Sequence, residues 1–276
     1  MTTHHHGKGY LPEPHVALYC SFRTSHPAAV RPMPLGLPDS VSLLSFEPPI
    51  QDQNGAGRCV GEAFGGGIYT LLGAKGFPPP APYSARAAYD LAREIDRADL
   101  NPPGSWPPLL DIGCQPNQCA RAIAKFGLAD IVQVDGGNST VDPAKIDVDL
   151  TLAEFEACRA RLVSPLKDIT WTAIANGDPD KLAQVDQALA AGYPVVFGVE
   201  ADAAFDSYDG SQPLHYTGTS ANHMQRAVAY RTMPDGSRQY LQINSWGKTW
   251  GMGGMAWVVA DSIANYTYGM MIPRLP

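Results

Sequence analysis

The hydrophobic residues of the first half of the chain recur with the period of a helix. The clearest stripe begins at Cys59 and continues to Leu72, which predicts a helix with one buried face. Four more helices are expected where a capping residue opens a periodic run, at residues 84–97, 118–126, 151–162 and 181–191. Of these, the third opens with a capping box from Thr151 to Glu154.

Strand-like runs replace the helical pattern in the second half. Short, mostly apolar runs occupy residues 193–200, 224–231, 238–243 and 255–259. A Pro-Asp-Gly turn separates the second run from the third, so these two are expected to form a hairpin. Helices that precede strands, rather than alternate with them, predict an α+β fold with segregated lobes.

Glycine and proline mark two unusual segments. Three glycines, residues 65–67, lie inside the first predicted helix, where they are costly unless another element packs closely against them. Prolines interrupt residues 1–46 too often for a long helix. We expect this segment to lie on the body of the protein instead of forming a domain.

Composition limits the classes of binding partner more than it limits the choice of fold. The formal net charge is -7 and the pI is about 5.4, and no cluster of Lys and Arg suggests nucleic acid or an anionic membrane. No apolar run is long enough for a transmembrane helix, and the first ten residues lack a signal-peptide core. The compartment stays undetermined, with the cytoplasm as the default. We expect no cofactor and no metal site, and the run His4-His5-His6 is a weak metal candidate.

Five cysteines occur in the chain, an odd number that leaves at least one without an intrachain partner. Without a signal peptide, reduced thiols are the expectation. Cys114 and Cys119 are five residues apart. Buried free thiols are favoured for this pair, while a disulfide or a metal pair stays open.

Cys59 is the first candidate for chemistry because it stands where the first helix begins. The helix dipole and the unpaired N–H groups there favour a thiolate and lower the thiol pKa. Gly57 allows a tight turn before Cys59, so that backbone N–H groups can face the carbonyl oxygen of a reacting substrate. Gln53 can direct a side-chain N–H toward the same oxygen. A buried cysteine at the start of a core helix is the alternative interpretation.

His223 and Asn244 supply the base and the group that orients it. His223 opens one predicted strand of the hairpin and Asn244 follows the next, so the two side chains can be neighbours. Ser245 and Trp246 come directly after Asn244, and Trp250 follows. The two tryptophans can shield a His–Asn hydrogen bond from water.

Together these residues resemble the three motifs of papain-like cysteine peptidases. Gln53 to Cys59 resembles the nucleophile motif, with Gln six residues before Cys, and His223 followed by Asn244-Ser245-Trp246-Gly247 resembles the second and third motifs in order. The resemblance extends over nearly the whole chain. The likeness is strongest to bacterial members with a short N-terminal extension, of the xylellain type, on Gly9-Tyr10-Leu11-Pro12 and on Asp111-Ile112-Gly113.

The resemblance implies a two-lobed papain-like fold. Residues 1–36 would be an N-terminal extension that covers the cleft and restrains activity. Residues 37–276 would be the peptidase domain, with a mainly helical lobe at 37–165 and a mainly β lobe at 166–276.

The resemblance also implies the chemistry. Cys59 would attack a peptide carbonyl, His223 would act as base and acid, Asn244 would orient it, and Gln53 would bind the oxyanion. Supporting roles fall to Gly57, Ser245 and Trp246. Two alternatives stay open: a non-catalytic binding or assembly protein on the same scaffold, and a thiol transpeptidase or acyl-transferase.

Overall fold

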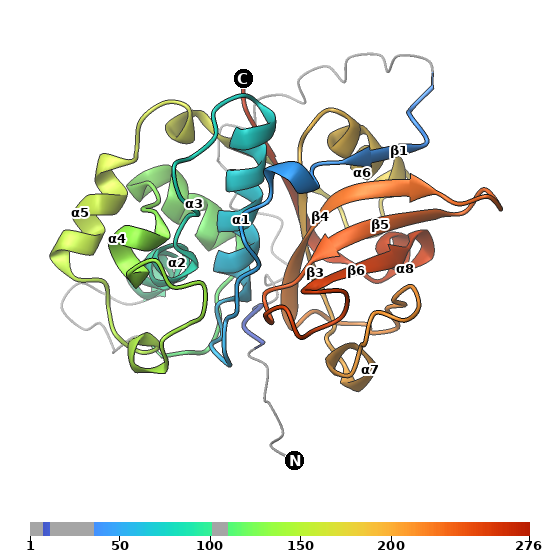
Figure 1. The fold of residues 1–276 in the computed structure, drawn as a ribbon. Coiled ribbons are helices and arrows are strands. Elements are labelled where there is room, and N and C mark those ends of the chain that lie inside the picture. Colours follow the sequence, from blue (N-terminus) through green and yellow to red (C-terminus); the bar gives the residue numbers. More distant parts are fainter. Residues whose placement is uncertain (1–7, 12–35, 101–109) are drawn as a thin grey trace.

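The protein has a helical lobe and a sheet lobe that meet along one long helix. The structure is a computed structural model that describes residues 8–11, 36–100 and 110–276. Figure 1 shows helix α1 (Cys59–Ala74) in the middle, the other helices of the first half on one side and the strands on the other. This arrangement confirms the predicted α+β fold with segregated lobes.

The helical lobe forms where the apolar stripes were found. Its elements are α1, α2 (Ala85–Leu100), α3 (Pro116–Phe126), α4 (Ile131–Asp135) and α5 (Leu152–Ala160). Ser84 caps α2 by accepting a hydrogen bond from the Ala87 N–H at 3.0 Å. The capping box from Thr151 to Glu154 is present at α5. Buried faces of these helices form one hydrophobic cluster around α1.

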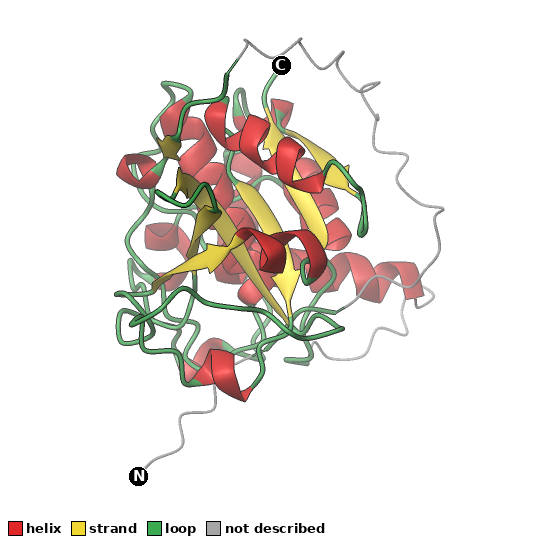
Figure 2. Ribbon diagram, turned by 90° about the vertical axis from the view of Figure 1, so that its right-hand side faces the viewer, coloured by secondary structure: helices red, strands yellow, loops and turns green. Residues whose placement is uncertain are grey.

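The sheet lobe contains an antiparallel sheet of seven strands among the described residues. Its path runs β2 (Thr170–Ile174), β7 (Tyr268–Arg274), β3 (Val195–Val199), β4 (His223–Thr232), β5 (Arg238–Ile243) and β6 (Met255–Val259), while β1 (Ser40–Ser42) pairs with β4. Helices lie on either side of the strands (Figure 2). The helices of this lobe are α6 (Lys181–Ala190), α7 (Ala203–Asp206) and α8 (Ala260–Asn265).

Several elements were not predicted from the pattern. Three 3₁₀ turns, η1 (Leu44–Phe46), η2 (Pro143–Lys145) and η3 (Leu166–Asp168), were missed, as were β1, β2, β7, α4, α7 and α8. These helices have at most six residues and β1 has three, too short for a period to register. In β7 a proline interrupts the run, because Pro273 stands near its end. The helix expected to end at about residue 162 ends two residues earlier, at Ala160.

The glycines of α1 mark places where other elements come close. A Cβ on Gly66 would lie 2.4 Å from the Arg226 guanidinium carbon, and one on Gly61 would lie 2.3 Å from the Ala85 carbonyl oxygen. Gly65 has more room, because its nearest neighbour, Tyr83, would be 3.7 Å away. Within the run of three glycines, close packing therefore explains the one at position 66.

Replacing Gly61 with Ala should destabilise the protein by about 1–3 kcal/mol, because the new methyl group would overlap a backbone carbonyl that only a shift of α2 can relieve. Gly65→Ala, one turn further along the same helix, is the matched control. It should be neutral or stabilising by up to about 1 kcal/mol, since alanine is the better helix former. Urea unfolding measures both variants, and equal stability of the two would contradict the packing argument.

Candidate active site

Cys59 is the first residue of α1, as the sequence predicted, but its sulfur is buried. Its thiol has no exposed surface, and the Gly9 N–H approaches the sulfur at an N···Sγ distance of 3.4 Å. Burial raises the pKa of Cys59 from 9.0 to about 12, although the N–H groups of Gly9, Met224 and Val60 act in the opposite direction. The expectation of a lowered thiol pKa was therefore wrong for this covered arrangement, because burial outweighs the helix terminus.

His223 and Asn244 are neighbours at one end of the β4–β5 hairpin. The ladder between these strands ends with Arg226 opposite Ile243, so the residues just beyond it lie side by side. His223 Nε2 and Asn244 Oδ1 are 2.8 Å apart. The same amide oxygen accepts the Ser245 N–H at 2.8 Å. This second bond fixes the orientation of the amide.

Two aromatic rings enclose the imidazole. The ring of Trp246 lies 4.7 Å from that of His223, centroid to centroid, and the ring of Phe205 meets it edge-on at 5.8 Å. Trp250 packs on Phe205 at 4.9 Å and donates its indole N–H to the Phe205 carbonyl at 2.9 Å. The His–Asn pair is consequently buried, with His223 and Asn244 almost without exposed surface.

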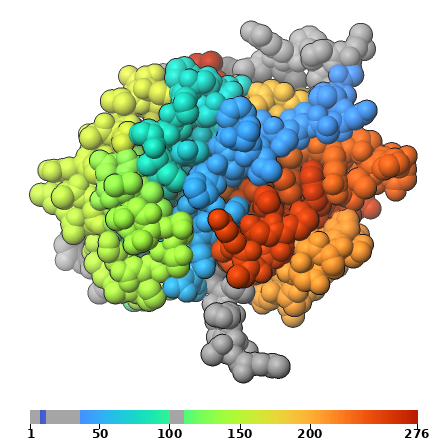
Figure 3. Space-filling model, viewed as in Figure 1, coloured from blue at the N-terminus to red at the C-terminus, as the bar shows by residue number. Residues whose placement is uncertain are grey.

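The Cys59 sulfur lies beside the start of strand β4, across the boundary between the lobes. Met224 directly follows His223, and its backbone N–H is directed at the Cys59 sulfur. Cys59 comes from the helical lobe and His223 from the sheet. Residues 36–58, blue in Figure 3, run along this boundary on the surface. The fold thus joins two groups that are far apart in the sequence.

Gln53 lies in the loop before α1 and is fully buried. Its backbone N–H bonds the Ser245 carbonyl at 2.8 Å, and its side-chain oxygen accepts the Ser245 hydroxyl. The side-chain nitrogen donates to the Ala56 carbonyl at 2.6 Å. Ser245 therefore links the loop that carries Gln53 to the strand end that carries Asn244.

Asp111 is a positioning residue whose role the sequence did not reveal. Both of its carboxylate oxygens accept the Gly57 N–H at 2.9 Å, and one accepts the Tyr89 hydroxyl at 2.8 Å. The Tyr89 oxygen in turn accepts the Gly113 N–H at 2.9 Å. These bonds hold the approach to Cys59, and they occupy the Gly57 N–H. The only sequence signal was the Asp-x-Gly pattern itself.

Residues 8–11 cross the site directly above the nucleophile. The Tyr10 N–H donates to the Asn222 carbonyl at 3.2 Å, and the Leu11 N–H donates to the Cys114 carbonyl at 3.1 Å. The Cys114 N–H donates in turn to the Gly9 carbonyl at 2.9 Å. The segment is therefore hydrogen-bonded to both lobes.

Gly9 and Tyr10 fit this path closely. A Cβ on Gly9 would lie 1.5 Å from the Gly57 carbonyl oxygen, so no other residue fits there without movement. Tyr10 is buried, and its ring fills a hollow at Gly198, Ala221 and Gly269. A Cβ on either of the two glycines would collide with the Tyr10 side chain.

The remaining cysteines are structural in character. Cys114, Cys119 and Cys158 are free and buried, which agrees with the favoured interpretation of the pair at 114 and 119. Cys20 and the His4-His5-His6 run lie outside the described residues. Within the described part, no group of His, Cys, Asp or Glu is placed to hold a metal ion, and no helix has the length and apolar character of a membrane span.

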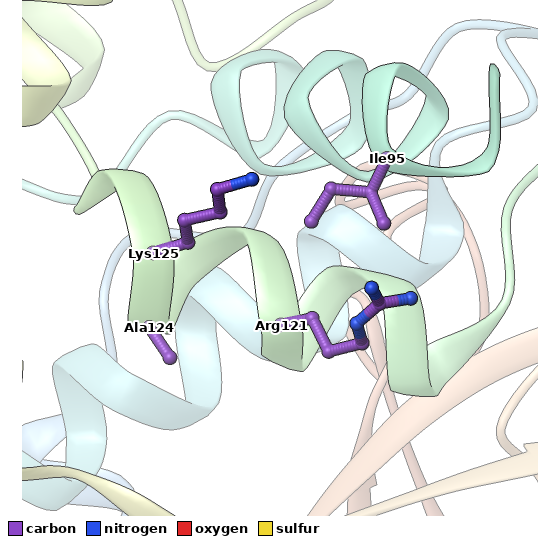
Figure 4. Close-up of a pocket in the computed structure, with 4 residues that line it drawn as sticks. All are labelled: Ile95, Arg121, Ala124 and Lys125. Atoms are coloured by element: carbon purple, nitrogen blue, oxygen red, sulfur yellow. The ribbon is translucent and has the colours of Figure 1, made fainter. Parts of the chain in front are cut away.

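A hollow on the helical lobe does not belong to this site. It has a volume of about 280 Å³ and is lined by Ile95, Arg121, Ala124 and Lys125 from α2 and α3 (Figure 4). Arg121 is engaged by Asp99 and Gln118. The hollow contains neither a nucleophile nor a base, and we assign no function to it.

Comparisons with known proteins agree with this geometry. The model of the papain family cysteine proteases matches residues 144–271. An uncharacterized peptidase C1-like protein of Acanthamoeba polyphaga mimivirus is 25% identical over 150 residues, which are 52% of this chain and 45% of that protein. The chain thus matches less than half the length of this curated relative.

Among solved structures, xylellain, a cysteine protease from Xylella fastidiosa, superposes with a TM-score of 0.69 at 20% identity, over 99% of this chain and 97% of that one. A digestive procathepsin L 3 of Tenebrio molitor superposes with a TM-score of 0.63 at 17% identity, over 99% and 76%. At these identities the likeness shows the fold. The predicted papain-like fold is confirmed, and so is the resemblance of the chain to papain family cysteine proteases.

Proposed function

Because the chain has the papain-like fold and its second half matches the papain family, we propose that it hydrolyses peptide bonds with Cys59 as the nucleophile. The observation that carries this proposal is the position of the Cys59 thiol beside the first residues of β4. The thiol at the start of α1 lies beside the first residues of β4, and His223 there is held by Asn244 at 2.8 Å. Nucleophile, base and orienting group are the parts that covalent catalysis needs.

His223 takes the thiol proton as the sulfur attacks the substrate carbonyl, and returns it to the leaving amine. Asn244 accepts a hydrogen bond from the Nε2–H group and so fixes the orientation of the ring, in which Nδ1 carries out this transfer. In the second half of the reaction His223 activates the water that releases the acyl group. Trp246 and Phe205 cover the His–Asn bond and keep water from competing for it.

Gln53 and the Cys59 backbone N–H stabilise the oxyanion. The bond from the side-chain nitrogen to the Ala56 carbonyl and the bond from the Ser245 hydroxyl to the side-chain oxygen hold the Gln53 amide in a fixed orientation. Donors held in advance are effective because they need not reorganise as charge develops.

Residues 8–11 act as an intramolecular cover within the N-terminal extension, residues 1–36, and residues 37–276 form the peptidase domain. Three observations support the cover: the contact of Gly9 with the sulfur, the backbone bonds to Asn222 and Cys114, and the buried Tyr10 ring. A substrate must reach the same sulfur, so the cover and the substrate exclude each other. Residues 12–35 lie outside the described part of the chain.

Labelling with an epoxide inhibitor tests the proposed nucleophile. We expect an adduct on Cys59, which becomes accessible when residues 8–11 move away, and none on Cys114 or Cys119, whose thiols are buried and whose pKa values are raised by burial. Labelling and hydrolysis of a fluorogenic peptide should both be lost in Cys59→Ala. Mass spectrometry of the labelled protein locates the adduct, and labelling elsewhere with no peptide cleaved would support a binding protein on the same scaffold.

The transpeptidase alternative makes a different product from the same acyl-enzyme. An added amine would then appear joined to the acyl fragment in place of the free acid. We expect the free acid, since nothing in the described residues favours an amine over water at this site. Product analysis by mass spectrometry separates the two reactions.

A further inference from the structure

A second cavity opens beside the proposed active site, and its walls are acidic and aromatic. It has a volume of about 440 Å³ and lies between the loop before α1, the segment that begins in α7, and the loop after β5. Three of its residues are carboxylates, Asp52, Asp206 and Asp209, and three are aromatic, Tyr208, Trp246 and Trp250. We call it the acidic pocket.

The charge of the acidic pocket is not balanced from within. Among the described residues that line it there is no Lys, Arg or His. Asp209 is fully exposed, and the hydroxyl and N–H of Ser211 lower its pKa, so it stays ionised. Carboxylates combined with aromatic faces suit a cation on an apolar stem, because the rings attract the cation as well as its stem.

The chain itself places a cation at the rim of this pocket. Lys8 Nζ lies 3.2 Å from Asp206 Oδ2 and donates to the Ala201 carbonyl at 2.6 Å. Lys8 directly precedes Gly9, the residue that touches the Cys59 sulfur. Figure 1 shows α7 and residues 8–11 at the same end of the molecule. The side chain of Lys8, the neighbour of the residue that contacts the Cys59 sulfur, therefore reaches the acidic wall of the pocket.

Trp246 indicates on which side of the scissile bond the acidic pocket lies. This ring packs on His223 at 4.7 Å and also lines the acidic pocket. Since His223 protonates the leaving amine, the pocket opens on the leaving-group side of the scissile bond.

We propose that the acidic pocket binds a lysine or arginine side chain of the peptide substrate, on the leaving-group side of the scissile bond. The proposal rests on the proposed peptidase activity. In the covered protein Lys8 occupies the rim through Asp206, and a substrate cation takes that place when the cover moves away. Asp206 and Asp209 are the residues that set this preference.

The test compares peptides cleaved by the full-length protein. A fluorogenic peptide series carries Lys, Arg, Gln or Glu at the positions that follow the scissile bond, and mass spectrometry locates each cut. We expect kcat/KM for the Lys and Arg peptides to exceed that for the Gln peptide by at least about tenfold, as hydrogen bonds between charged groups allow. The ratio is the readout because movement of the cover affects all peptides alike.

In the variant Asp206→Asn/Asp209→Asn this ratio should fall to near one, and the Glu peptide should gain. Asp235→Asn, in the β4–β5 turn, removes one negative charge outside the pocket and should leave the ratio unchanged. Added salt should also reduce the ratio in the unaltered protein, because screening shortens the range of charges, and this measurement needs no variant.

The outcomes separate this inference from the activity on which it rests. Cleavage of all four peptides at equal rates, or a preference that survives in Asp206→Asn/Asp209→Asn, would overturn the acidic pocket as a subsite and leave the peptidase intact. If no peptide is cut and Cys59 is not labelled, the proposed function itself fails.

Discussion

A full-length chain carrying Gly9→Ala should hydrolyse peptides on the order of 100-fold faster than the unaltered chain. The Gly9 Cβ would lie 1.5 Å from the Gly57 carbonyl oxygen, so the covered arrangement cannot form with a methyl group there. If about 99% of the molecules are covered, release of the cover exposes roughly 100 times more active protein. Initial rates with a fluorogenic peptide measure the gain.

Two controls define the cause of this gain. The double variant Gly9→Ala/Cys59→Ala should be inactive, which ties the activity to the proposed nucleophile. A chain that begins at Leu37 should match Gly9→Ala, because it lacks the cover entirely. Unchanged rates in both Gly9→Ala and the shortened chain would show that residues 8–11 do not restrain turnover.

The pH dependence of the cover has a defined sign. Burial raises the pKa of Cys59 from 9.0 to about 12 in the covered protein, so the covered state holds the thiol proton more tightly than an exposed thiol would. The contribution of this proton to covering is complete below pH 9 and is lost as the pH rises toward 12. Labelling of Cys59 should therefore increase more steeply with pH in the unaltered chain than in Gly9→Ala.

Replacing Arg226 with Met should destabilise the protein by about 3–5 kcal/mol. Arg226 Nε donates to Glu47 Oε2 at 2.9 Å, and both side chains are almost completely buried. Thr70 on α1 also donates to Glu47, and the guanidinium packs against Gly66. Without the guanidinium, the Glu47 carboxylate is left buried between the lobes without its cation.

The double variant Glu47→Leu/Arg226→Met tests the reason for that loss. It should recover most of the stability, because no uncompensated charge remains in the interior. Arg121→Met removes an exposed partner of Asp99 and should change the stability by less than about 1 kcal/mol. Urea unfolding measures all three, and an equal loss in the single and double variants would contradict the buried-charge explanation.

The sequence predicted the fold and the pairing of His223 with Asn244 because their signals are local or follow from the hairpin. The stripe after Cys59 identified α1, and the turn at 234–236 aligned His223 with Asn244. The sequence could not predict what depends on contacts between distant segments. The ion pair from Arg226 to Glu47 spans 179 positions along the chain, and no periodicity connects its ends.

The thiol pKa shows the same limit at the site itself. A helix terminus lowers a cysteine pKa, and the sequence placed Cys59 at such a terminus. Its actual environment depends on Gly9, which is 50 positions away. Burial of the sulfur reverses the direction of the shift, although the Gly9 N–H itself acts to lower the pKa. Local rules therefore placed Cys59 correctly at the start of α1 but gave the wrong direction for the shift of its pKa.

The backbone bonds of residues 8–11 have a consequence for how the enzyme would be switched on. An inhibitory peptide joined to its own target acts at a high effective concentration, so even a few hydrogen bonds and one buried ring suffice to keep it in place. A single cut in the chain between Leu11 and Gly36 would remove that tether. The short fragment would then dissociate on dilution, and activation would be irreversible without any change in the contacts themselves.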